Sequence, residues 1–439
     1  MTDQDRLSYR QAVDALTERG RFGISMGLAR VERLMDEVGR PDRDLRGALV
    51  GGTNGKGSVV ALAQSVLTEA GYRIGTMPKP HLVEYRERIA LDGSPVSETD
   101  FAAAVGRVLP AIDRVAAAVG PPTEFEALTA AAITELARRR VDLALVEVGM
   151  GGRLDATNVL DLGVAVITTV QLDHQAHLGR TLAAIGTEKA AIIKPGNVAV
   201  TGARGRGVRP IRDRCAALGV PLLRAGGRGA YGARVVDEGW DGVVVDVTTP
   251  GRRLEGLRIG LLGRHQAANT AVAIAMLDAI AERFGLEVPE QALRRGLAGA
   301  RWPGRLELLD GARVGLPRVL LDGAHNPAGA TALADALGGL GLRRPTIVFG
   351  AMRAKDVRGV LRALAPLKPR FVFTAVDDPG AMSPEDLAAA WAAVGGSART
   401  AADPRAALDM AEGDPVVVAG SLYLVGAVRG MITGMDEQP

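Results

Sequence analysis

Short apolar runs alternate with helical patterns along most of this chain, and that alternation restricts its fold more than any other feature. Residues 48–52 form a strand-like run that enters a glycine-rich turn, and residues 58–70 then place apolar side chains at helical spacing. Residues 141–148 and 164–170 are almost continuously apolar, as strands buried on both faces of a parallel sheet are. The alternation therefore predicts an α/β fold built on a parallel sheet.

Two changes of pattern divide the rest of the chain. Between residues 222 and 262 apolar and polar residues alternate and are interrupted by turns, which predicts a small antiparallel excursion, and residues 266–284 return to helical periodicity. After Trp302-Pro303-Gly304 the strand and helix alternation restarts, with strand-like runs at 319–322, 346–350, 370–376 and 415–419. We therefore expect one domain over residues 1–298, a linker at 299–304, and a smaller Rossmann-like α/β domain over 305–439. Ligands should bind at the carboxyl ends of the strands, in the cleft between the domains.

Composition excludes several classes of function. The 439 residues include 53 Lys and Arg against 50 Asp and Glu, and these charges are interspersed, which favours a mixed surface over a nucleic-acid site. No apolar run approaches the roughly 18 residues of a membrane helix, and the first residues lack a signal-peptide pattern, so we expect a cytoplasmic protein. The single cysteine, Cys215, excludes an internal disulfide and is expected to be a small buried side chain.

Lysine is scarce in this chain, which makes each lysine a candidate for a specific role. Arginine supplies all but six of the 53 basic residues, so an ammonium group is retained at few positions. The six are Lys56, Lys79, Lys189, Lys194, Lys355 and Lys368.

A glycine-rich loop at residues 51–58 (GGTNGKGS) lies between a predicted strand and a predicted helix, as a phosphate-binding loop does. Its glycines allow backbone N–H groups to point at one anion, the helix N-terminus favours negative charge, and Lys56 adds a cation. The loop departs from the G-x-x-x-x-G-K-[ST] pattern because Gly57 precedes the hydroxyl of Ser58. A plain strand-to-helix turn is the alternative. The predicted nucleotide-binding residues here are Thr53, Asn54, Gly55, Lys56, Gly57 and Ser58.

Polar side chains end two of the buried strands. Glu147 ends the run at 141–148, and Asp173-His174 follow the run at 164–170. A carboxylate at such a place is costly unless it is paired or holds a cation, and Mg²⁺ beside nucleotide phosphates would fit it. We predict metal binding by Glu147 and His174, with simple ion pairing as the alternative, and a structural or capping role for His265.

Nine collinear segments resemble the folylpolyglutamate synthase and dihydrofolate synthase branch of the Mur ligases. They are GTNGKGS, PHLVEYRERI, FEALTAAA, VEVGMGGRLDATN, LDH with EKAAIIKPG, HQAANTAVA, WPGRLE, DGAHNP and GSLYLVG. The resemblance implies a P-loop-containing Mur-ligase-like domain with the antiparallel excursion, followed by a smaller glutamate-binding domain. It also implies a monomeric, ADP-forming ligase that joins L-glutamate to dihydropteroate or a folate through an acyl phosphate, with ATP and two Mg²⁺ ions.

The same resemblance implies roles for particular residues. Lys56 and the loop amides hold phosphates, Ser58 and Glu147 bind one Mg²⁺, and His174 binds a second. Lys189 matches a lysine that CO₂ carbamylates in this family, which would turn a cation into an oxygen ligand; the alternative is a surface lysine paired with Glu188. The predicted nucleotide contacts are Asn269, Arg305, Asp322 and His325, and the predicted catalytic residues are Lys56, His174, Lys189 and His325. The predicted substrate contacts are Lys79, His81, Phe125, Thr129, Asp155 and Ser421, with packing of the last strand and helix as the alternative for Ser421.

Lys79 is the one clear departure from the family pattern. The family usually has Ser-Pro-His-Leu where this chain has Lys79-Pro80-His81-Leu82, and that serine normally ligates the first Mg²⁺. A protonated lysine cannot ligate a metal ion. Either Lys79 supplies positive charge to the γ-phosphate, with Glu147 and water completing the metal shell, or the site is altered.

Three other functions remain open on the sequence alone. A peptidoglycan-precursor ligase would share the ATP machinery, although residues 125–132 and the DATN segment favour the folate branch. A non-catalytic nucleotide-binding regulator would retain the loop. A nicotinamide oxidoreductase is indicated only by the α/β pattern, because Gly149 and Gly151 are followed by Leu154 where a third glycine is needed.

Overall fold

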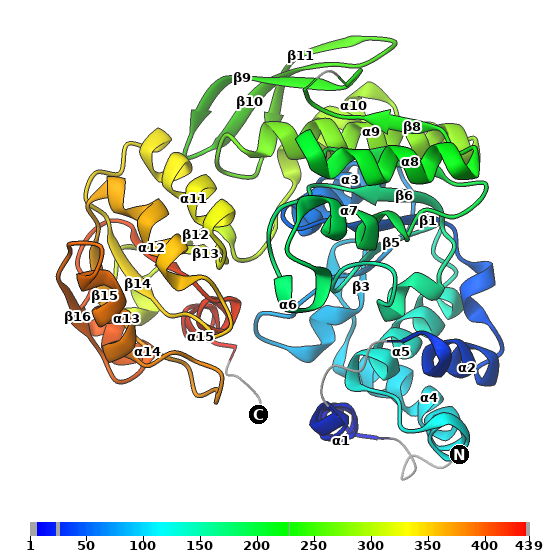
Figure 1. Ribbon diagram of the computed structural model, residues 1–439, viewed down its shortest axis with the longest axis horizontal. Helices are drawn as coiled ribbons and strands as arrows, with labels where there is room; N and C mark the ends of the chain where they lie inside the picture. Colours follow the sequence, from blue (N-terminus) through cyan, green and yellow to red (C-terminus); the bar gives the residue numbers. More distant parts are fainter. Residues whose placement is uncertain (1–6, 23–26, 228, 436–439) are drawn as a thin grey trace.

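The computed structural model describes residues 7–22, 27–227 and 229–435. Two α/β bodies lie side by side (Figure 1): the first, coloured blue to green, surrounds an eight-stranded sheet, and the second, yellow to red, surrounds a six-stranded sheet. A three-stranded sheet lies at the top of the first body in this view. The α/β class predicted from the sequence, with its antiparallel excursion, is confirmed.

The larger sheet has the order β4-β3-β2-β5-β1-β6-β7-β8. Six neighbouring strands from β2 to β8 are parallel, and β3 and β4 extend the β2 edge in antiparallel fashion. The strands are β1 (Gly47–Gly51), β2 (Ile74–Met77), β3 (Ala90–Leu91), β4 (Ser94–Pro95), β5 (Leu143–Glu147), β6 (Gly163–Ile167), β7 (Val198–Thr201) and β8 (Leu222–Arg224).

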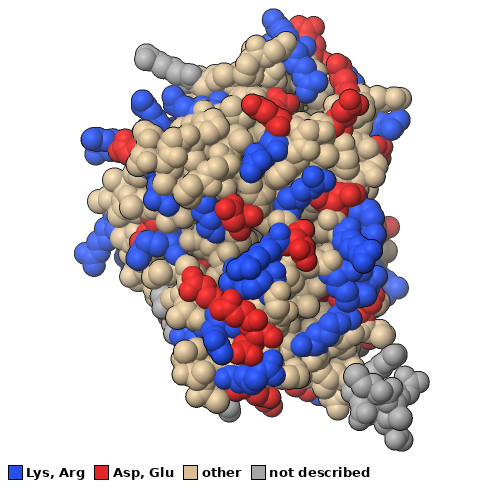
Figure 2. Space-filling model, turned by 90° about the vertical axis from the view of Figure 1, so that its right-hand side faces the viewer, with Lys and Arg blue, Asp and Glu red and all other residues tan. Residues whose placement is uncertain are grey.

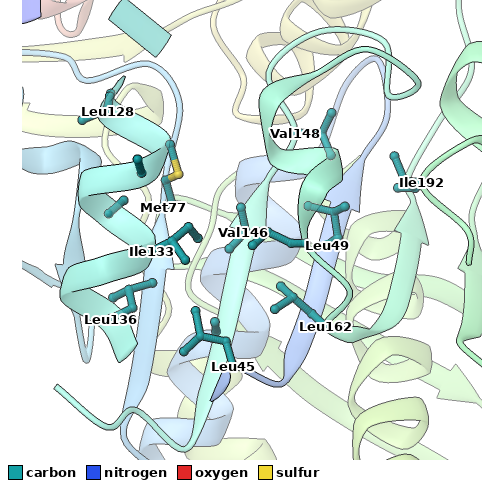
Figure 3. Close-up of a cluster of buried hydrophobic side chains, with 14 of the residues drawn as sticks. Leu45, Leu49, Met77, Leu128, Ile133, Leu136, Val146, Val148, Leu162 and Ile192 are labelled. Carbon is teal, nitrogen blue, oxygen red and sulfur yellow. The ribbon is translucent and has the colours of Figure 1, made fainter. Parts of the chain in front are cut away.

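This sheet is covered by helices on both faces, which explains its continuously apolar strands. Successive side chains of a strand point to opposite faces, so Leu49 and Val146 pack in one cluster while Val50 and Leu145 pack in the other. Figure 3 shows the first cluster, in which strand residues such as Leu49 and Val146 lie near Ile133 of a covering helix.

The helices of the first body follow the strands in the order expected for crossover connections. They are α1 (Tyr9–Thr17), α2 (Ala29–Glu37), α3 (Lys56–Glu69), α4 (Glu98–Val119), α5 (Glu124–Arg138), α6 (Gln175–Leu178), α7 (Leu182–Ala190), α8 (Val208–Leu218), α9 (Gln266–Phe284) and α10 (Glu290–Gly299). Helix α9 has the bounds that the sequence predicts. Helix α3 begins two residues earlier than predicted, so Lys56 stands in its first turn.

The antiparallel sheet is formed by β9 (Gly232–Gly239), β10 (Gly242–Thr248) and β11 (Arg253–Ile259), in the order β11-β10-β9. Its apolar face, including Val243 and Val245, packs in the same cluster as α9. The predicted excursion began at residue 222, but β8 instead joins the large sheet parallel to β7. Because β8 has only three residues, its sequence pattern does not distinguish the two arrangements.

The second body contains a six-stranded sheet in the order β12-β13-β17-β14-β15-β16, in which only the edge strand β12 is antiparallel to its neighbour. The strands are β12 (Arg305–Asp310), β13 (Arg318–Asp322), β14 (Thr346–Phe349), β15 (Arg370–Phe373), β16 (Ala398–Thr400) and β17 (Val416–Ala419). The helices are α11 (Pro327–Gly339), α12 (Val357–Leu364), α13 (Pro384–Ala392), α14 (Pro404–Asp409) and α15 (Leu422–Thr433). Since α10 ends at Gly299 and β12 begins at Arg305, the predicted linker at 299–304 lies between them, and the domain boundary itself stays a prediction.

Seven short 3-10 helices complete the described elements. They are η2 (Glu18–Phe22), η3 (Pro41–Asp44), η4 (Tyr85–Arg88), η5 (Ala156–Val159), η6 (Gly205–Gly207), η7 (Ala312–Val314) and η8 (Ala365–Leu367). Within the described ranges, no helix is both long and apolar enough to cross a bilayer. Figure 2 shows Lys and Arg interspersed with Asp and Glu on the face it presents, the mixed surface expected from the sequence.

Candidate active site between the two domains

A cavity of about 870 Å³ opens between the two bodies at the carboxyl ends of their parallel strands. It collects nearly all of the predicted site residues from elements far apart in the chain. Those lining it are Thr53, Asn54, Gly55, Lys56, Gly57, Ser58, Lys79, Phe125, Glu147, Asp155, His174, Lys189, Asn269, Arg305, Asp322, His325 and Ser421. Two predicted residues, His81 and Thr129, are not among the described residues of its wall.

The glycine-rich loop is held open toward the cavity. Gly55, in the left-handed region at φ 85°, precedes α3, and no side chain caps the first turn of this helix. The end of β6 fixes the loop from behind, because Thr169 Oγ1 accepts a hydrogen bond from the Asn54 N–H (2.9 Å) and Thr168 Oγ1 donates to the Asn54 carbonyl (2.7 Å). Lys56 Nζ donates to the carbonyls of Gly52 (3.2 Å) and Thr53 (3.3 Å). The loop therefore presents an uncapped helix N-terminus and an ammonium group to one space, as an anion site requires.

Packing against Trp302 explains why a glycine stands at position 57, where it interrupts the loop pattern. A Cβ on Gly57 would lie 2.6 Å from ring atoms of Trp302, which is closer than atoms can approach. We expect Gly57→Ala to displace Trp302 and to lower the free energy of unfolding by about 1–3 kcal/mol, the usual cost of overpacking. Thermal unfolding with and without ADP measures the effect.

The matched control is Gly338→Ala in α11, where a Cβ meets no atom within 4 Å. That change should be neutral or stabilising, because it only restricts the unfolded chain and favours the helix. Equal melting temperatures for Gly57→Ala and the unchanged protein would show that the loop tolerates a Cβ at this place.

Glu147, at the end of β5, carries a buried carboxylate beside the loop. The side chain of Glu147 is 6% exposed, and its Oε1 lies 3.7 Å from Lys56 Nζ. Its Oε2 accepts no hydrogen bond from any described residue. Burial raises the pKa of Glu147, while the charges of Lys56 and Arg305 oppose that rise. An unsatisfied buried carboxylate oxygen facing a phosphate-type loop is a suitable ligand for a cation.

Lys189, in α7, is also buried against the loop. Its Nζ donates to the Gly52 carbonyl (2.9 Å), and the residue is 3% exposed. Burial, reinforced by the charge of Lys56, lowers the pKa of Lys189 to about 7. Glu188 pairs instead with Arg153 (3.0 Å). The alternative of a surface lysine paired with Glu188 is therefore wrong.

His174 and Asp173 follow β6 at the mouth of the cavity. His174 adopts the left-handed conformation at φ 49°, and its Nε2 lies 3.9 Å from an oxygen of Asp173, a weak version of the ion pairing considered above. Burial lowers the pKa of His174, and the charge of Lys355 adds to this effect, so the neutral imidazole is favoured. Among the residues that the structure describes, no group of three His, Cys, Asp or Glu side chains could hold a metal ion.

Contacts between the two domains converge on the same place. Lys355 Nζ lies 3.1 Å from Asp173 Oδ1, and Asn326 Nδ2 donates to Asp173 Oδ2 (3.3 Å) and to Asn54 Oδ1 (3.1 Å). Burial opposes ionisation of Asp173, but the charge of Lys355 and its hydrogen bond lower the pKa of this carboxyl. The second domain therefore reaches both the glycine-rich loop and the strand end next to it. Lys355 lies in none of the motifs found in the sequence. The scarcity of lysine was the available signal for its role.

Another part of the cavity wall is aromatic and polar. Lys79 Nζ lies 3.5 Å from the centroid of the Phe125 ring. Asp155 is fixed by the backbone N–H groups of Met150 (2.8 Å) and Thr157 (3.1 Å), both of which donate to its carboxylate. Thr129 is fully buried, and its hydroxyl donates to the Phe125 carbonyl (2.7 Å), so it positions Phe125 from within α5.

His81 lies behind this region with Arg88. Its Nδ1 accepts a hydrogen bond from Arg88 Nε (3.0 Å), and burial together with the Arg88 charge lowers the pKa of His81 to about 3. Arg88 and Glu124 line the cavity although sequence reasoning gave neither a role. The ERI segment that contains Arg88 was part of the resemblance, and this was the available signal.

The remaining predicted contacts come from α9 and the second domain. Asp322 accepts hydrogen bonds from the N–H groups of Leu306 (3.0 Å) and Ala324 (2.9 Å), while burial raises its pKa. His325 Nδ1 faces the Gly323 carbonyl at 2.7 Å, which requires a proton on Nδ1, and burial lowers the pKa of His325 to about 4. Its Nε2 is then a neutral acceptor.

Three further residues complete the account of the site. Asn269 Nδ2 donates to Gln266 Oε1 (2.8 Å), and its Oδ1 lies where a Cβ on Gly55 would come within 2.5 Å. Ser421 Oγ accepts from the Tyr423 N–H (3.2 Å) at the start of α15, in keeping with the packing alternative. His265 lines the cavity and is the N-cap residue of α9, but its side chain caps no N–H group, so of its two predicted roles the structural one remains a prediction.

Comparisons with known proteins identify the family. The Mur ligase middle domain matches residues 50–277, and the Mur ligase, glutamate ligase domain matches residues 304–422. The dihydrofolate synthase/folylpolyglutamate synthase of Bacillus subtilis is 33% identical, over 96% of this chain and 98% of the relative. That of Mycobacterium tuberculosis is 35% identical, over 94% and 91%. The chain belongs to the folylpolyglutamate synthase/dihydrofolate synthase family of Mur ligases.

Solved structures of this family agree with the whole fold. Mycobacterium tuberculosis folylpolyglutamate synthase complexed with ADP is 33% identical, with a TM-score of 0.89 over 98% of this chain and 99% of that chain. Escherichia coli FolC in complex with DHPP and ADP is 29% identical, with a TM-score of 0.85 over 96% and 98%. The chain is thus an ATP-dependent glutamate ligase of this family, as the resemblance implied, and the interpretation as a nicotinamide oxidoreductase is wrong.

Proposed function

We propose that this protein joins L-glutamate to dihydropteroate, to a folate, or to both, through an acyl phosphate formed with ATP. The arrangement of the cavity is the observation that carries the proposal. One space is lined both by the loop with Lys56 and by Phe125 with Asp155. A γ-phosphate on the loop and the carboxylate of a pterin-bearing aromatic acid can therefore meet between them. The monomeric state and cytoplasmic location expected from the sequence belong to this proposal.

In the first step, an oxygen of the acid's carboxylate attacks the γ-phosphorus, and ADP leaves. Lys56 and the N-terminus of α3 stabilise the negative charge on the phosphoryl oxygens and hold the triphosphate in line with the acid. Asn269, Arg305 and Asp322 would position the nucleotide from α9 and from the second domain. The bond formed joins the carboxylate oxygen to phosphorus, and the bond broken is that between the β- and γ-phosphates.

Two Mg²⁺ ions fit this end of the cavity. The carboxylate of Glu147, with its unsatisfied Oε2, and the hydroxyl of Ser58 would hold one ion, while the neutral imidazole of His174 and a carbamate on Lys189 would hold the second. Magnesium takes its remaining ligands from phosphate oxygens and water. Bound there, Mg²⁺ neutralises charge on the phosphate oxygens.

Carbamylation of Lys189 requires a neutral amine. The Nζ lone pair forms a bond to the carbon of CO₂, and one proton leaves the nitrogen. A buried amine with its pKa lowered to about 7 is largely neutral under physiological conditions, whereas an ordinary lysine is not. The resulting carbamate presents oxygens where the unmodified residue presents only a nitrogen atom.

In the second step, the amine of L-glutamate attacks the acyl carbon and phosphate leaves. His325, neutral at physiological pH and with Nε2 as an acceptor, would hold an N–H of the incoming amine. Phe125 and Asp155 hold the pterin-bearing part, with Thr129 supporting Phe125 and His81 supporting Arg88. Ser421, which lines the cavity at the start of α15, would contact the substrate from the second domain.

Mass spectrometry of the products tests the proposal. Incubation with ATP, Mg²⁺, L-glutamate and either dihydropteroate or tetrahydrofolate should add one glutamyl residue to at least one of the two acids. EDTA should abolish that product, because Glu147 and His174 would then lack their ions. A product formed only from a nucleotide-sugar peptide would support the peptidoglycan-precursor alternative, and ATP binding without any product would support the regulator.

A further inference from the structure

Lys79 lines the cavity, and its ammonium group forms no ion pair with any residue that the structure describes. It follows β2 and lies at the carboxyl edge of the large sheet, next to the end of β5. Its ammonium group lies over the face of the Phe125 ring, 3.5 Å from the centroid, and faces the cavity. Such a contact is weaker than a hydrogen-bonded pair of opposite charges.

The carboxylate nearest to the place of Lys79 is already satisfied. A Cβ on Gly149 would lie 2.2 Å from Lys79 Nζ and 2.8 Å from Asp155 Oδ2, so both groups crowd the same glycine. Both carboxylate oxygens of Asp155 already accept hydrogen bonds, one from the Met150 N–H and the other from the N–H and hydroxyl of Thr157. No carboxylate oxygen of a described residue lies within 4.0 Å of Lys79 Nζ, and no hydrogen bond from this Nζ is found in that part of the chain. The charge is therefore available to a ligand.

The surroundings of Lys79 indicate which ligand it would meet. The charged groups that act on it are Asp155, Arg88, Glu147 and Lys56, and Lys79 in turn acts on the carboxyl of Glu124. Lys79 thus contacts the Phe125 ring and also feels the charge of Lys56 in the phosphate loop. An aromatic acid whose carboxylate reaches the γ-phosphate must place that carboxylate between these two features.

We propose that Lys79 binds the carboxylate of the acid that is to be activated, as a fixed cation that needs no metal ion. The inference rests on the proposed function and adds to it the residue that recognises the reacting end of the acid. An ammonium–carboxylate pair is a charge-assisted hydrogen bond and is stronger than the contact with the ring that it replaces. Lys79 therefore acts on the aromatic side of the phosphoryl group, rather than only on the γ-phosphate as the sequence suggested.

Binding measurements with three ligands and three proteins test this role. The proteins are the unchanged enzyme, Lys79→Met, which keeps the length and removes the charge, and Lys79→Arg, which keeps the charge. The ligands are dihydropteroate and its primary carboxamide, titrated by calorimetry in EDTA without nucleotide, and ADP is titrated separately. Lys79→Met should weaken dihydropteroate binding about ten- to hundredfold, the value of one hydrogen bond to a charged group. The carboxamide and ADP should bind within about twofold of the unchanged enzyme.

Each alternative gives a different result. Equal weakening of dihydropteroate and carboxamide binding by Lys79→Met would mean that the lysine only supports Phe125, and would overturn the proposal. Weakened ADP binding with unchanged dihydropteroate binding would assign the cation to the phosphates and would also overturn it. Retention of most of the affinity for dihydropteroate by Lys79→Arg supports a role of charge. Circular dichroism checks the folding of each variant, and Lys79→Ser replaces Lys79→Met if the latter does not fold. If the unchanged enzyme binds neither acid under any condition, the proposed function fails before Lys79 is tested.

Discussion

Replacing Lys56 by methionine should lower kcat/KM for ATP by about 10²–10³-fold, the usual loss when a group that stabilises developing charge is removed. Lys56 is the cation of the phosphate loop, and its Nζ is held by the carbonyls of Gly52 and Thr53 at the start of α3. Methionine keeps the length of the side chain but cannot offset charge on the phosphoryl oxygens as ADP leaves. Steady-state release of ADP in the presence of the acid and glutamate measures the effect.

The same change should spare the fold while weakening the nucleotide complex. Glu147 lies 3.7 Å from Lys56 Nζ and loses a nearby cation, so its pKa should rise further in the variant. Thermal unfolding with and without ADP separates this local effect from a loss of binding. Lys368→Gln is the matched control, because that lysine is exposed in the second domain and does not line the cavity. Full activity of Lys56→Met would remove the basis for a triphosphate site at this loop.

The strands that the sequence revealed are those buried on both faces. Residues 141–148 and 164–170 are predictable because a parallel strand between two helical layers needs apolar side chains throughout. Strand β2 (Ile74–Met77) is missed because it has only four residues, one of them Gly75, which is too short a run for a strand pattern to be recognised. Its place beside β5 is decided by tertiary contacts that no local pattern encodes.

The candidate site shows the same limit. Glu147 and His174 could be found because each follows a recognisable buried strand, and the carboxyl ends of parallel strands meet at one edge. Lys355 could not be placed, since its contact with Asp173 joins positions 182 residues apart in two different domains. The burial of Lys189 could not be predicted from the sequence either. Lys189 and Glu188 are neighbours in the sequence, but neighbouring side chains point to different faces of a helix such as α7.

Lys189→Met should lower kcat by about 10²-fold, an effect at the low end of that expected for a lost electrostatic group in the active site. The reason is specific to the proposed carbamate, because methionine cannot react with CO₂ and offers no oxygen to a cation. Incubation of the unchanged enzyme with ¹³C-labelled bicarbonate should give a carbamate signal in its NMR spectrum, and Lys189→Met should not. A short carboxylate such as formate should partly restore the activity of Lys189→Ala, where the shortened side chain leaves room for it.

The pH dependence of the unchanged enzyme follows from the same residue. Burial lowers the pKa of the Lys189 amine to about 7 from the ordinary value of 10.5, so the amine is neutral above pH 7 and protonated below it. Only the neutral amine reacts with CO₂. Activity at a fixed concentration of CO₂ should therefore fall as the pH is lowered through about 7, and the residual activity of Lys189→Met should lack this step.

A second buried lysine provides the control for the labelling. Lys194 also has its pKa lowered by burial, but its Nζ donates to the carbonyls of Asn158 and Leu160 outside the cavity lining. Lys194→Arg keeps those donors, so the carbamate signal should survive in this variant. A signal that persists in Lys189→Met, or activity of the unchanged enzyme that does not depend on CO₂, would contradict the carbamate. The buried amine of Lys189 would then act as a hydrogen-bond donor to Gly52, which fixes the loop without supplying a metal ligand.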